Sequence, residues 1–181
     1  MMLGRALALV ICLAEAASSA ESEGPRGGGL PRGARVDRLV AHKGAHRLEA
    51  YAGDRLLATY RIAIGAGGAG PKRWEGDRRT PEGVYRIDRR HQSRRYHRFL
   101  HVSYPNDDDR RRYEALAARG EVPDGKGIGG DIGVHGAARG EELRRIDASS
   151  DWTEGCIAVS DSEIEALYEA VVRDAVIEIR P

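Results

Sequence analysis

Short apolar runs, each ended by a turn signal, recur through most of this chain from Val36 onward. The first three runs, which follow one another with glycine-containing turns between them, are residues 36–42, 46–51 and 56–64. Runs of this length bounded by glycine or aspartate are typical of strands joined by tight turns. We therefore expect the folded part to begin near Val36 with an antiparallel meander.

Five more segments have the same character, and two segments differ from it. The further expected strands are 84–88, 99–104, 131–135, 157–159 and 175–179. Residues 107–119 have acids at the start and a glycine just after the end, which predicts a helix. Ser160 and Glu163 form a capping box ahead of apolar residues at helical spacing, namely Ile164, Leu167, Tyr168 and Val171. The expected class is mainly β (α+β), with two or three helices.

The length and charge of the chain narrow the range of functions that it can have. A chain of 181 residues with 41% apolar composition buries one core. Its 29 lysines and arginines nearly balance 28 acids, for a net charge of +1. The balance gives no reason to expect a nucleic acid or an anionic membrane as partner.

The N-terminal region predicts export. Residues 1–20 combine Arg5, an apolar run and a small-residue end at Ala20, which is typical of a signal peptide. The run is too short to span a bilayer as a helix. Residues 21–35 are rich in glycine, proline and arginine and are expected to form a flexible linker. Residues 36–181 then form the functional domain.

Cleavage of this signal would remove Cys12 and leave Cys156 as the single cysteine. An exported chain usually pairs its cysteines, and one alone is either a buried small residue or a nucleophile. Gly155 before it allows a bend and close approach of a substrate. His135 ends a short strand and is the candidate base, because imidazole titrates near neutrality and can take a thiol proton.

Two segments together resemble a known family. They are Val134-His135-Gly136 and Trp152-Thr153-Glu154-Gly155-Cys156-Ile157, and upstream lie Ile62-Ala63-Ile64-Gly65 and Thr80-Pro81-Glu82-Gly83-Val84-Tyr85-Arg86-Ile87. In order and spacing they resemble the L,D-transpeptidase (YkuD-type) catalytic domain, over roughly Val36 to Ile179. The resemblance implies a YkuD-like β-sandwich with a few packed helices.

The resemblance also implies a chemistry that needs no cofactor. Cys156 attacks a carbonyl of a peptidoglycan stem peptide, His135 is the base, and the carbonyl of Gly136 orients its ring. An amine then resolves the acyl-enzyme to give a cross-link or an anchored lipoprotein, or water resolves it by hydrolysis. The expected location is the periplasm or the cell wall.

Two positions depart from the family pattern. Glu154 stands where the family often has a second histidine, and Ala158 stands where it often has an arginine. The departure leaves the direction of the reaction open between transfer and hydrolysis. A non-catalytic wall-binding module is a third hypothesis, and it requires Cys156 to be dispensable.

Other polar residues carry weaker hypotheses. His42 and His46, and His97 and His101, are spaced four apart but lie on turn or strand patterns, so no metal site is expected. His101 is a candidate cleft residue, and Trp152 a candidate wall of the thiol pocket. Glu154 is either a surface charge or a partner for a stem-peptide amine.

Overall fold

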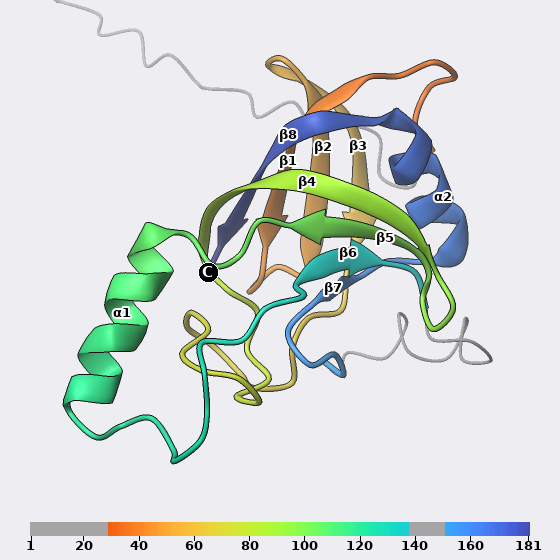
Figure 1. Ribbon diagram of the computed structural model, residues 1–181. Coiled ribbons are helices and arrows are strands. Elements are labelled where there is room, and N and C mark those ends of the chain that lie inside the picture. Colours follow the sequence, from red (N-terminus) through yellow and green to blue (C-terminus); the bar gives the residue numbers. More distant parts are fainter. Residues whose placement is uncertain (1–28, 138–150) are drawn as a thin grey trace, which may run out of the picture.

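The computed structural model describes residues 29–137 and 151–181, and one curled sheet dominates it (Figure 1). The strands are β1 (Val36–His42), β2 (Arg47–Ala52), β3 (Arg55–Arg61), β4 (Gly83–Ser93), β5 (His97–Val102), β6 (Gly133–His135), β7 (Ile157–Ala158) and β8 (Val171–Arg180). The helices are α1 (Asp107–Ala118) and α2 (Asp161–Ala170). The order of strands across the sheet is β3-β2-β1-β8-β4-β5-β6-β7.

The predicted meander is confirmed, and the C-terminal strand completes the sheet. β1, β2 and β3 pair antiparallel in sequence order. β8 lies between this meander and the β4–β5 hairpin, parallel to β1 and antiparallel to β4. The position of β8 in the sheet therefore comes from long-range pairing, which local turn signals do not encode.

The two edges of the sheet curl toward each other around the core. Just beyond β3, Ala63 exchanges two backbone hydrogen bonds with Ala158 of β7, at 3.0 and 2.8 Å. Inside lie fully buried residues from opposite parts of the sheet, among them Leu39, Leu100 and Ile177. The predicted class, mainly β with a few packed helices, is confirmed.

Helix α2 forms where the capping box predicted it. Ser160 Oγ accepts from the Glu163 N–H, and the Glu163 carboxylate accepts from the Ser160 N–H at 2.8 Å. Ile164 and Leu167 are fully buried against the sheet. The helical spacing of the apolar residues suggested that Val171 would continue the helix. In the structure it begins β8 instead. A β-branched residue fits the extended conformation, so the strand prevails there.

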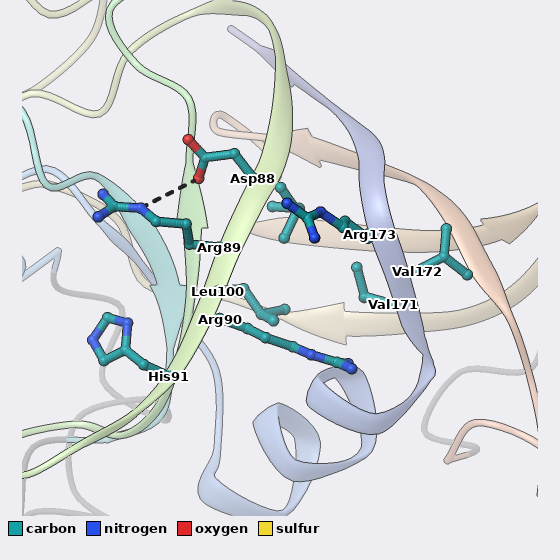
Figure 2. Close-up of a pocket in the computed structure, with 9 residues that line it drawn as sticks. Asp88, Arg89, Arg90, His91, Leu100, Val171, Val172 and Arg173 are labelled. Carbon is teal, nitrogen blue, oxygen red and sulfur yellow. Dashed lines mark ion pairs between the residues drawn. The ribbon is translucent and has the colours of Figure 1, made fainter.

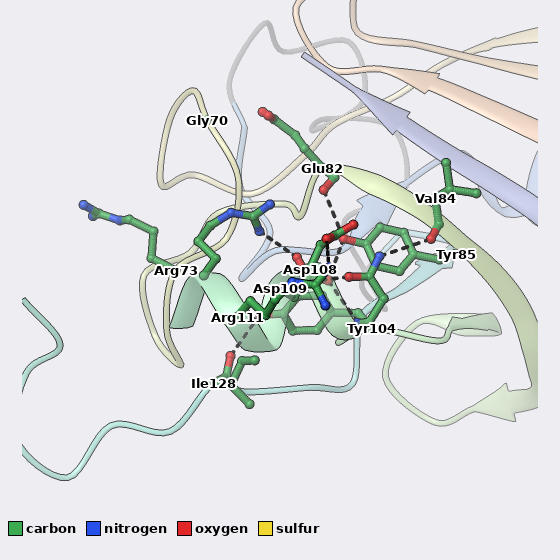
Figure 3. Close-up of polar contacts among 12 residues, drawn as sticks. Gly70, Arg73, Glu82, Val84, Tyr85, Tyr104, Asp108, Asp109, Arg111 and Ile128 are labelled. Atoms are coloured by element: carbon green, nitrogen blue, oxygen red, sulfur yellow. Dashed lines mark hydrogen bonds and ion pairs between the residues drawn. The ribbon is translucent and has the colours of Figure 1, made fainter. Parts of the chain in front are cut away.

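Helix α1 is attached to the sheet through buried polar groups (Figure 3). Asn106 caps its start, and Asp109 in the first turn is buried. The Tyr85 hydroxyl of β4 donates to Asp109 Oδ2 at 2.8 Å, and Arg112 pairs with the other carboxylate oxygen at 2.8 Å. Burial and the Asp109 carboxylate raise the pKa of Tyr85, which therefore remains a hydrogen-bond donor.

The predicted signal peptide at 1–20 and the first part of the predicted linker lie outside the described residues. In residues 29–35, Leu30 and Ala34 are partly buried against the core. Neither α1 nor α2, the helices of the described part of the chain, is long and apolar enough to cross a membrane.

Candidate active site

The segment leading to Cys156 is hydrogen-bonded to the chain just after β3. Thr153 donates its N–H to the Ile64 carbonyl at 3.1 Å, and its own carbonyl accepts from the Ala66 N–H at 3.0 Å. Asp151 Oδ1 accepts from the Ile64 N–H at 3.1 Å and lies 3.0 Å from His46 Nε2. The turn that presents the thiol is thereby fixed at its start.

Thr153 and Gly155 then determine the shape of that turn. The buried Thr153 hydroxyl donates to the Cys156 carbonyl at 2.7 Å and accepts from the Gly155 N–H at 3.1 Å. Gly155 has φ +129°, and a Cβ there would lie 2.8 Å from the Arg79 carbonyl oxygen. Only glycine both adopts this positive φ readily and leaves room for the Arg79 carbonyl, so the sequence Thr-x-Gly-Cys specifies the bend.

The thiol of Cys156 is half-buried and unpaired. Its Sγ lies 3.5 Å from the Asp131 carbonyl oxygen. Burial raises the pKa of the thiol to about 11, against the opposing effects of the Gly133 backbone and the Lys72 ammonium. Cys156 is therefore a neutral thiol at pH 7, and a base must take its proton if the sulfur is to act as a nucleophile.

His135 lies on β6 with 1% of its surface exposed. Its Nδ1 is 2.6 Å from the Gly136 carbonyl oxygen, which can only accept. Nδ1 therefore carries the proton, and Nε2 presents a lone pair. Burial lowers the pKa of His135 to about 4, partly opposed by the Gly136 hydrogen bond and assisted by the charge of Arg95. At neutral pH the ring is an uncharged base.

Three aromatic rings surround this imidazole. Tyr96 stacks on it with centroids 4.1 Å apart, Phe99 lies parallel at 5.8 Å, and Trp152 meets it edge-on at 5.9 Å. The Tyr96 carbonyl also accepts from the Gly136 N–H at 3.2 Å. Sequence reasoning placed Trp152 near the site but missed the other two. The alternation of Phe99 and His101 along a strand was the available signal for Phe99.

Gly136 joins the base to helix α2. A Cβ at this position would lie 2.3 Å from Asp161 Oδ1, the atom that accepts from the Ala137 N–H at 2.9 Å. The first turn of α2 therefore occupies the space that any larger residue would need. Through its contact with the Ala137 N–H, the same turn also fixes the Gly136 peptide group, whose carbonyl oxygen lies against the His135 ring.

Strand pairing brings His135 and Cys156 to one face of the sheet. β6 and β7 are parallel, with Val134 opposite Ile157 and His135 opposite Ala158. Cys156 comes directly before β7, two residues from Ala158, so a continuation of the strand alternation would place its side chain on the same side as that of His135. Strands about 4.8 Å apart with a rise of about 3.3 Å per residue separate the two Cα atoms by about 8 Å. A cysteine and a histidine side chain facing each other can meet across that separation.

The glycine-dense segment 65–70 is a turn packed against Gly155, the residue before Cys156. A Cβ at Gly65 would lie 2.1 Å from the Arg78 carbonyl oxygen and 2.9 Å from the Gly155 Cα. Buried Lys43 donates to the Gly70 and Thr80 carbonyls at 2.7 and 2.9 Å. These contacts make the segment a tight turn.

A buried ion pair, which sequence reasoning missed, lies close to the thiol. Lys72 Nζ is 2.8 Å from Asp77 Oδ1, and both side chains are almost fully buried. The Lys72 ammonium is the positive charge that counteracts the raised pKa of Cys156. The Asp77 carboxylate also accepts hydrogen bonds from the backbone N–H groups of Arg73 and Arg79, and these bonds hold the loop in place.

The remaining candidate residues occupy different environments. Glu154 is exposed and lies 3.2 Å from Arg78. His101 is buried at 8% exposure and contacts Asp88 and Arg89. Ala158 is fully buried and forms, with Ala63, the backbone bridge that joins the two edges of the sheet.

The two histidine pairs do not converge. His42, His46, His97 and His101 face four different acids, namely Glu49, Asp151, Glu165 and Asp88. Within residues 29–137 and 151–181, no three histidine, cysteine or acidic side chains gather as metal ligands.

A cavity of about 560 Å³ opens where β4 diverges from β8 (Figure 2). Its lining includes Arg89, Arg90, Leu100 and Val171, but neither His135 nor Cys156. We identify the candidate active site from the geometry of the thiol and the imidazole, because the reactive groups lie there.

Comparisons with known proteins identify the family of this chain. The sequence matches the model of the YkuD family, the L,D-transpeptidase catalytic domain, over residues 36–179. A putative L,D-transpeptidase, YafK, from Escherichia coli K12 is 38% identical over 58 residues, which is 31% of this chain and 24% of that protein.

Solved structures show the same fold at low identity. The helical cell shape determining protein Pgp2 from Campylobacter jejuni aligns with a TM-score of 0.55 and 22% identity, over 86% of this chain and 51% of that one. An L,D-transpeptidase from Xylanimonas cellulosilytica aligns with a TM-score of 0.52 and 15% identity, over 83% and 63%. This chain thus spans about a quarter of its curated relative and one half to two thirds of these structures. Because the family match extends over most of the chain and the fold agrees with it, this protein belongs to the L,D-transpeptidase (YkuD) catalytic domain family.

Proposed function

We propose that this protein is an exported cysteine acyltransferase that acts on peptidoglycan stem peptides through an acyl-enzyme on Cys156. His135 Nε2 takes the Sγ proton as the sulfur attacks a peptide carbonyl. The C–N bond breaks, the leaving amine takes the proton from His135, and a thioester remains on Cys156. An acceptor amine then attacks the thioester, forms a new amide and returns the proton to the thiol.

The state of the imidazole is the observation that carries this proposal. The 2.6 Å contact to Gly136 fixes the hydrogen on Nδ1, so Nε2 is the free lone pair. A thiol with a raised pKa and a base with a lowered pKa form a neutral pair at pH 7. Proton transfer therefore accompanies the attack rather than preceding it.

The turn before the thiol supports a place for the oxyanion. The Gly155 N–H is engaged by Thr153 Oγ1. The next donor along the chain is the Cys156 N–H, which we assign to the developing oxyanion. Trp152, in edge contact with His135, forms a wall of the acyl site. Glu154, exposed beside Arg78, is available to an amine of the stem peptide.

Water is the competing acceptor. Ala158, which is fully buried, stands where the family often has an arginine, so the wall of the site differs in this chain. The deciding experiment incubates the purified protein with disaccharide-tetrapeptides and analyses the muropeptides by mass spectrometry. Cross-linked or exchanged products support transfer, including attachment of a wall-linked lipoprotein if its amine is supplied. Products that are only shortened would replace transfer by hydrolysis.

Two variants test the enzyme hypothesis as a whole. Cys156→Ala should abolish every product, and Asp108→Asn, a change of an exposed side chain on α1, serves as the control beside it. If Cys156→Ser supported both turnover and complementation of a deletion strain, a non-catalytic wall-binding role would replace the enzyme.

Export is the last part of the proposal. We assign residues 1–20 to a signal peptide, 21–35 to a linker and 36–181 to the catalytic domain, and place the mature protein in the periplasm or at the cell wall. Mass spectrometry of the protein recovered from the periplasm should give an N-terminus near Glu21. Recovery of the full-length chain from the cytoplasm would refute the assignment.

A further inference from the structure

His101 lies on the same face of the sheet as the candidate catalytic pair. On β5, Phe99 is opposite His135, and His101 is opposite Gly133 on β6. Side chains two residues apart on a strand share a face. A row of side chains therefore leads from His135 past Phe99 to His101.

A β-bulge directs two side chains of β4 to His101. The pairing passes from Ile87 opposite Val102 to Arg89 opposite His101, which leaves Asp88 as the extra residue. Asp88 Oδ1 is 2.6 Å from His101 Nδ1, and Arg89 Nη2 is 2.9 Å from His101 Nε2. Both ring nitrogens are thus engaged within the chain.

The donors and acceptors of this cluster admit one arrangement. A guanidinium only donates, so His101 Nε2 accepts from Arg89 and Nδ1–H donates to the Asp88 carboxylate. The His101 side chain is 10% exposed, whereas that of Arg89 is 68% exposed. A buried histidine, fixed by a carboxylate, thus holds an exposed guanidinium in place.

Arg89 remains available for a ligand. It uses one of its five N–H groups on His101, and its Nε is 3.9 Å from Asp88, beyond hydrogen-bond distance. Arg90 points the other way, where its Nη1 donates to the Tyr168 carbonyl at 2.7 Å. Figure 2 shows Arg89 and Arg90 on opposite sides of β4.

The strand order sets the distance from the thiol. Arg89, His101 and Gly133 are opposite one another on β4, β5 and β6, and β7 follows as the strand that leads from Cys156. Three interstrand spacings separate β4 from β7 by about 14 Å. Because an extended peptide rises about 3.3 Å per residue, about four peptide units bridge that interval.

We propose that Arg89 binds a carboxylate of the stem peptide, with His101 and Asp88 as its positioning residues. The inference rests on the proposed function, because it takes the ligand to be the peptide attacked by Cys156. A fixed guanidinium suits a carboxylate, which it can grip through two parallel N–H groups. His101 itself, a candidate substrate contact by sequence, then acts through Arg89.

The test compares two donor peptides that differ at one group, a free carboxylate or the corresponding carboxamide. The wild-type protein should prefer the carboxylate by about 10- to 100-fold in kcat/KM, the range for a charge-assisted hydrogen bond. Arg89→Gln should remove most of this preference through a higher KM while leaving turnover of the carboxamide within about twofold. Arg173→Gln, which removes an exposed arginine from β8, should keep the preference.

His101 is tested through its dependence on Arg89. His101→Phe should lower the preference, His101→Gln should retain part of it because its amide oxygen can accept from Arg89, and His101→Phe should add nothing in the Arg89→Gln background. Thermal melts identify any variant that fails to fold, and the exposed Arg89→Gln keeps the test decisive if the His101 variants do not.

Two results would overturn this inference. They are a wild-type protein with no preference between the peptides, and an Arg89→Gln protein that keeps the wild-type preference. Acylation of Cys156 separates these results from failure of the proposed function. If Cys156→Ala still turned over both peptides, the function itself would fall; if Cys156 were acylated by both peptides without regard to Arg89, only the carboxylate site would fall.

Discussion

The buried imidazole of His135 should make the stability of the protein depend on pH in a way that one substitution removes. Burial lowers the pKa of this ring from 6.5 to about 4. Between these values the unfolded chain binds a proton that the folded chain does not, so stability is complete above pH 6.5 and falls as the pH decreases toward 4. Linkage with these two pKa values gives a loss of about 2–3 kcal/mol between pH 7.5 and pH 4.5.

The assay is urea unfolding, followed by fluorescence at both pH values, of the wild-type protein and His135→Phe. Phenylalanine keeps a ring among Tyr96, Phe99 and Trp152 but cannot bind a proton. The acid-induced loss of stability should therefore be smaller in the variant by about 2–3 kcal/mol. His91→Gln, which removes an exposed histidine, is the matched control and should keep the wild-type loss. Equal losses in the wild-type protein and His135→Phe would refute the buried neutral ring.

Three further substitutions probe the frame around the site. Gly136→Ala should destabilise the fold by about 1–3 kcal/mol, because its Cβ would meet Asp161 Oδ1 at 2.3 Å; an unchanged denaturation midpoint would contradict that crowding. Lys43→Met should cost at least about 2 kcal/mol, because it leaves the Glu82 carboxylate and two carbonyl groups without their buried donor; calorimetry measures it, and a neutral result would mean that the ammonium is dispensable. Glu154→Gln should change stability by less than about 0.5 kcal/mol, since its ion pair is exposed; a change in KM at unchanged stability would then report a substrate contact.

Local signals predicted the elements of this fold well. Turn residues separated the strands of the meander, and the Ser160–Glu163 capping box located the start of α2. What the sequence did not encode locally was the position of β8 between β1 and β4. That position depends on pairing between residues 90 to 138 positions apart, which leaves no trace in turn chemistry or hydrophobic period.

The residues of the candidate site divide in the same way, into those that the local sequence predicts and those that only the fold reveals. Cys156 and His135 stood out because their residue types suit acyl transfer and glycine adjoins each of them. Tyr96 and Lys72 did not stand out, because an aromatic ring in a hairpin and a lysine in a glycine-rich loop are common on protein surfaces. Only the fold brings Tyr96 onto the imidazole and buries Lys72 beside Asp77. His101 was a candidate cleft residue by sequence, and its contacts with Asp88 and Arg89 depend on a β-bulge that the local sequence does not reveal.

The central claim is that the Cys156 thiol, activated by His135, forms a covalent acyl-enzyme. Intact-protein mass spectrometry with a carbapenem and with a disaccharide-tetrapeptide tests it most directly, followed by peptide mapping of the adduct. The account predicts one adduct per chain, located on Cys156, absent from Cys156→Ala and formed far more slowly in His135→Phe. An adduct that persists in Cys156→Ala, or stem-peptide turnover by that variant at the wild-type rate, would contradict it.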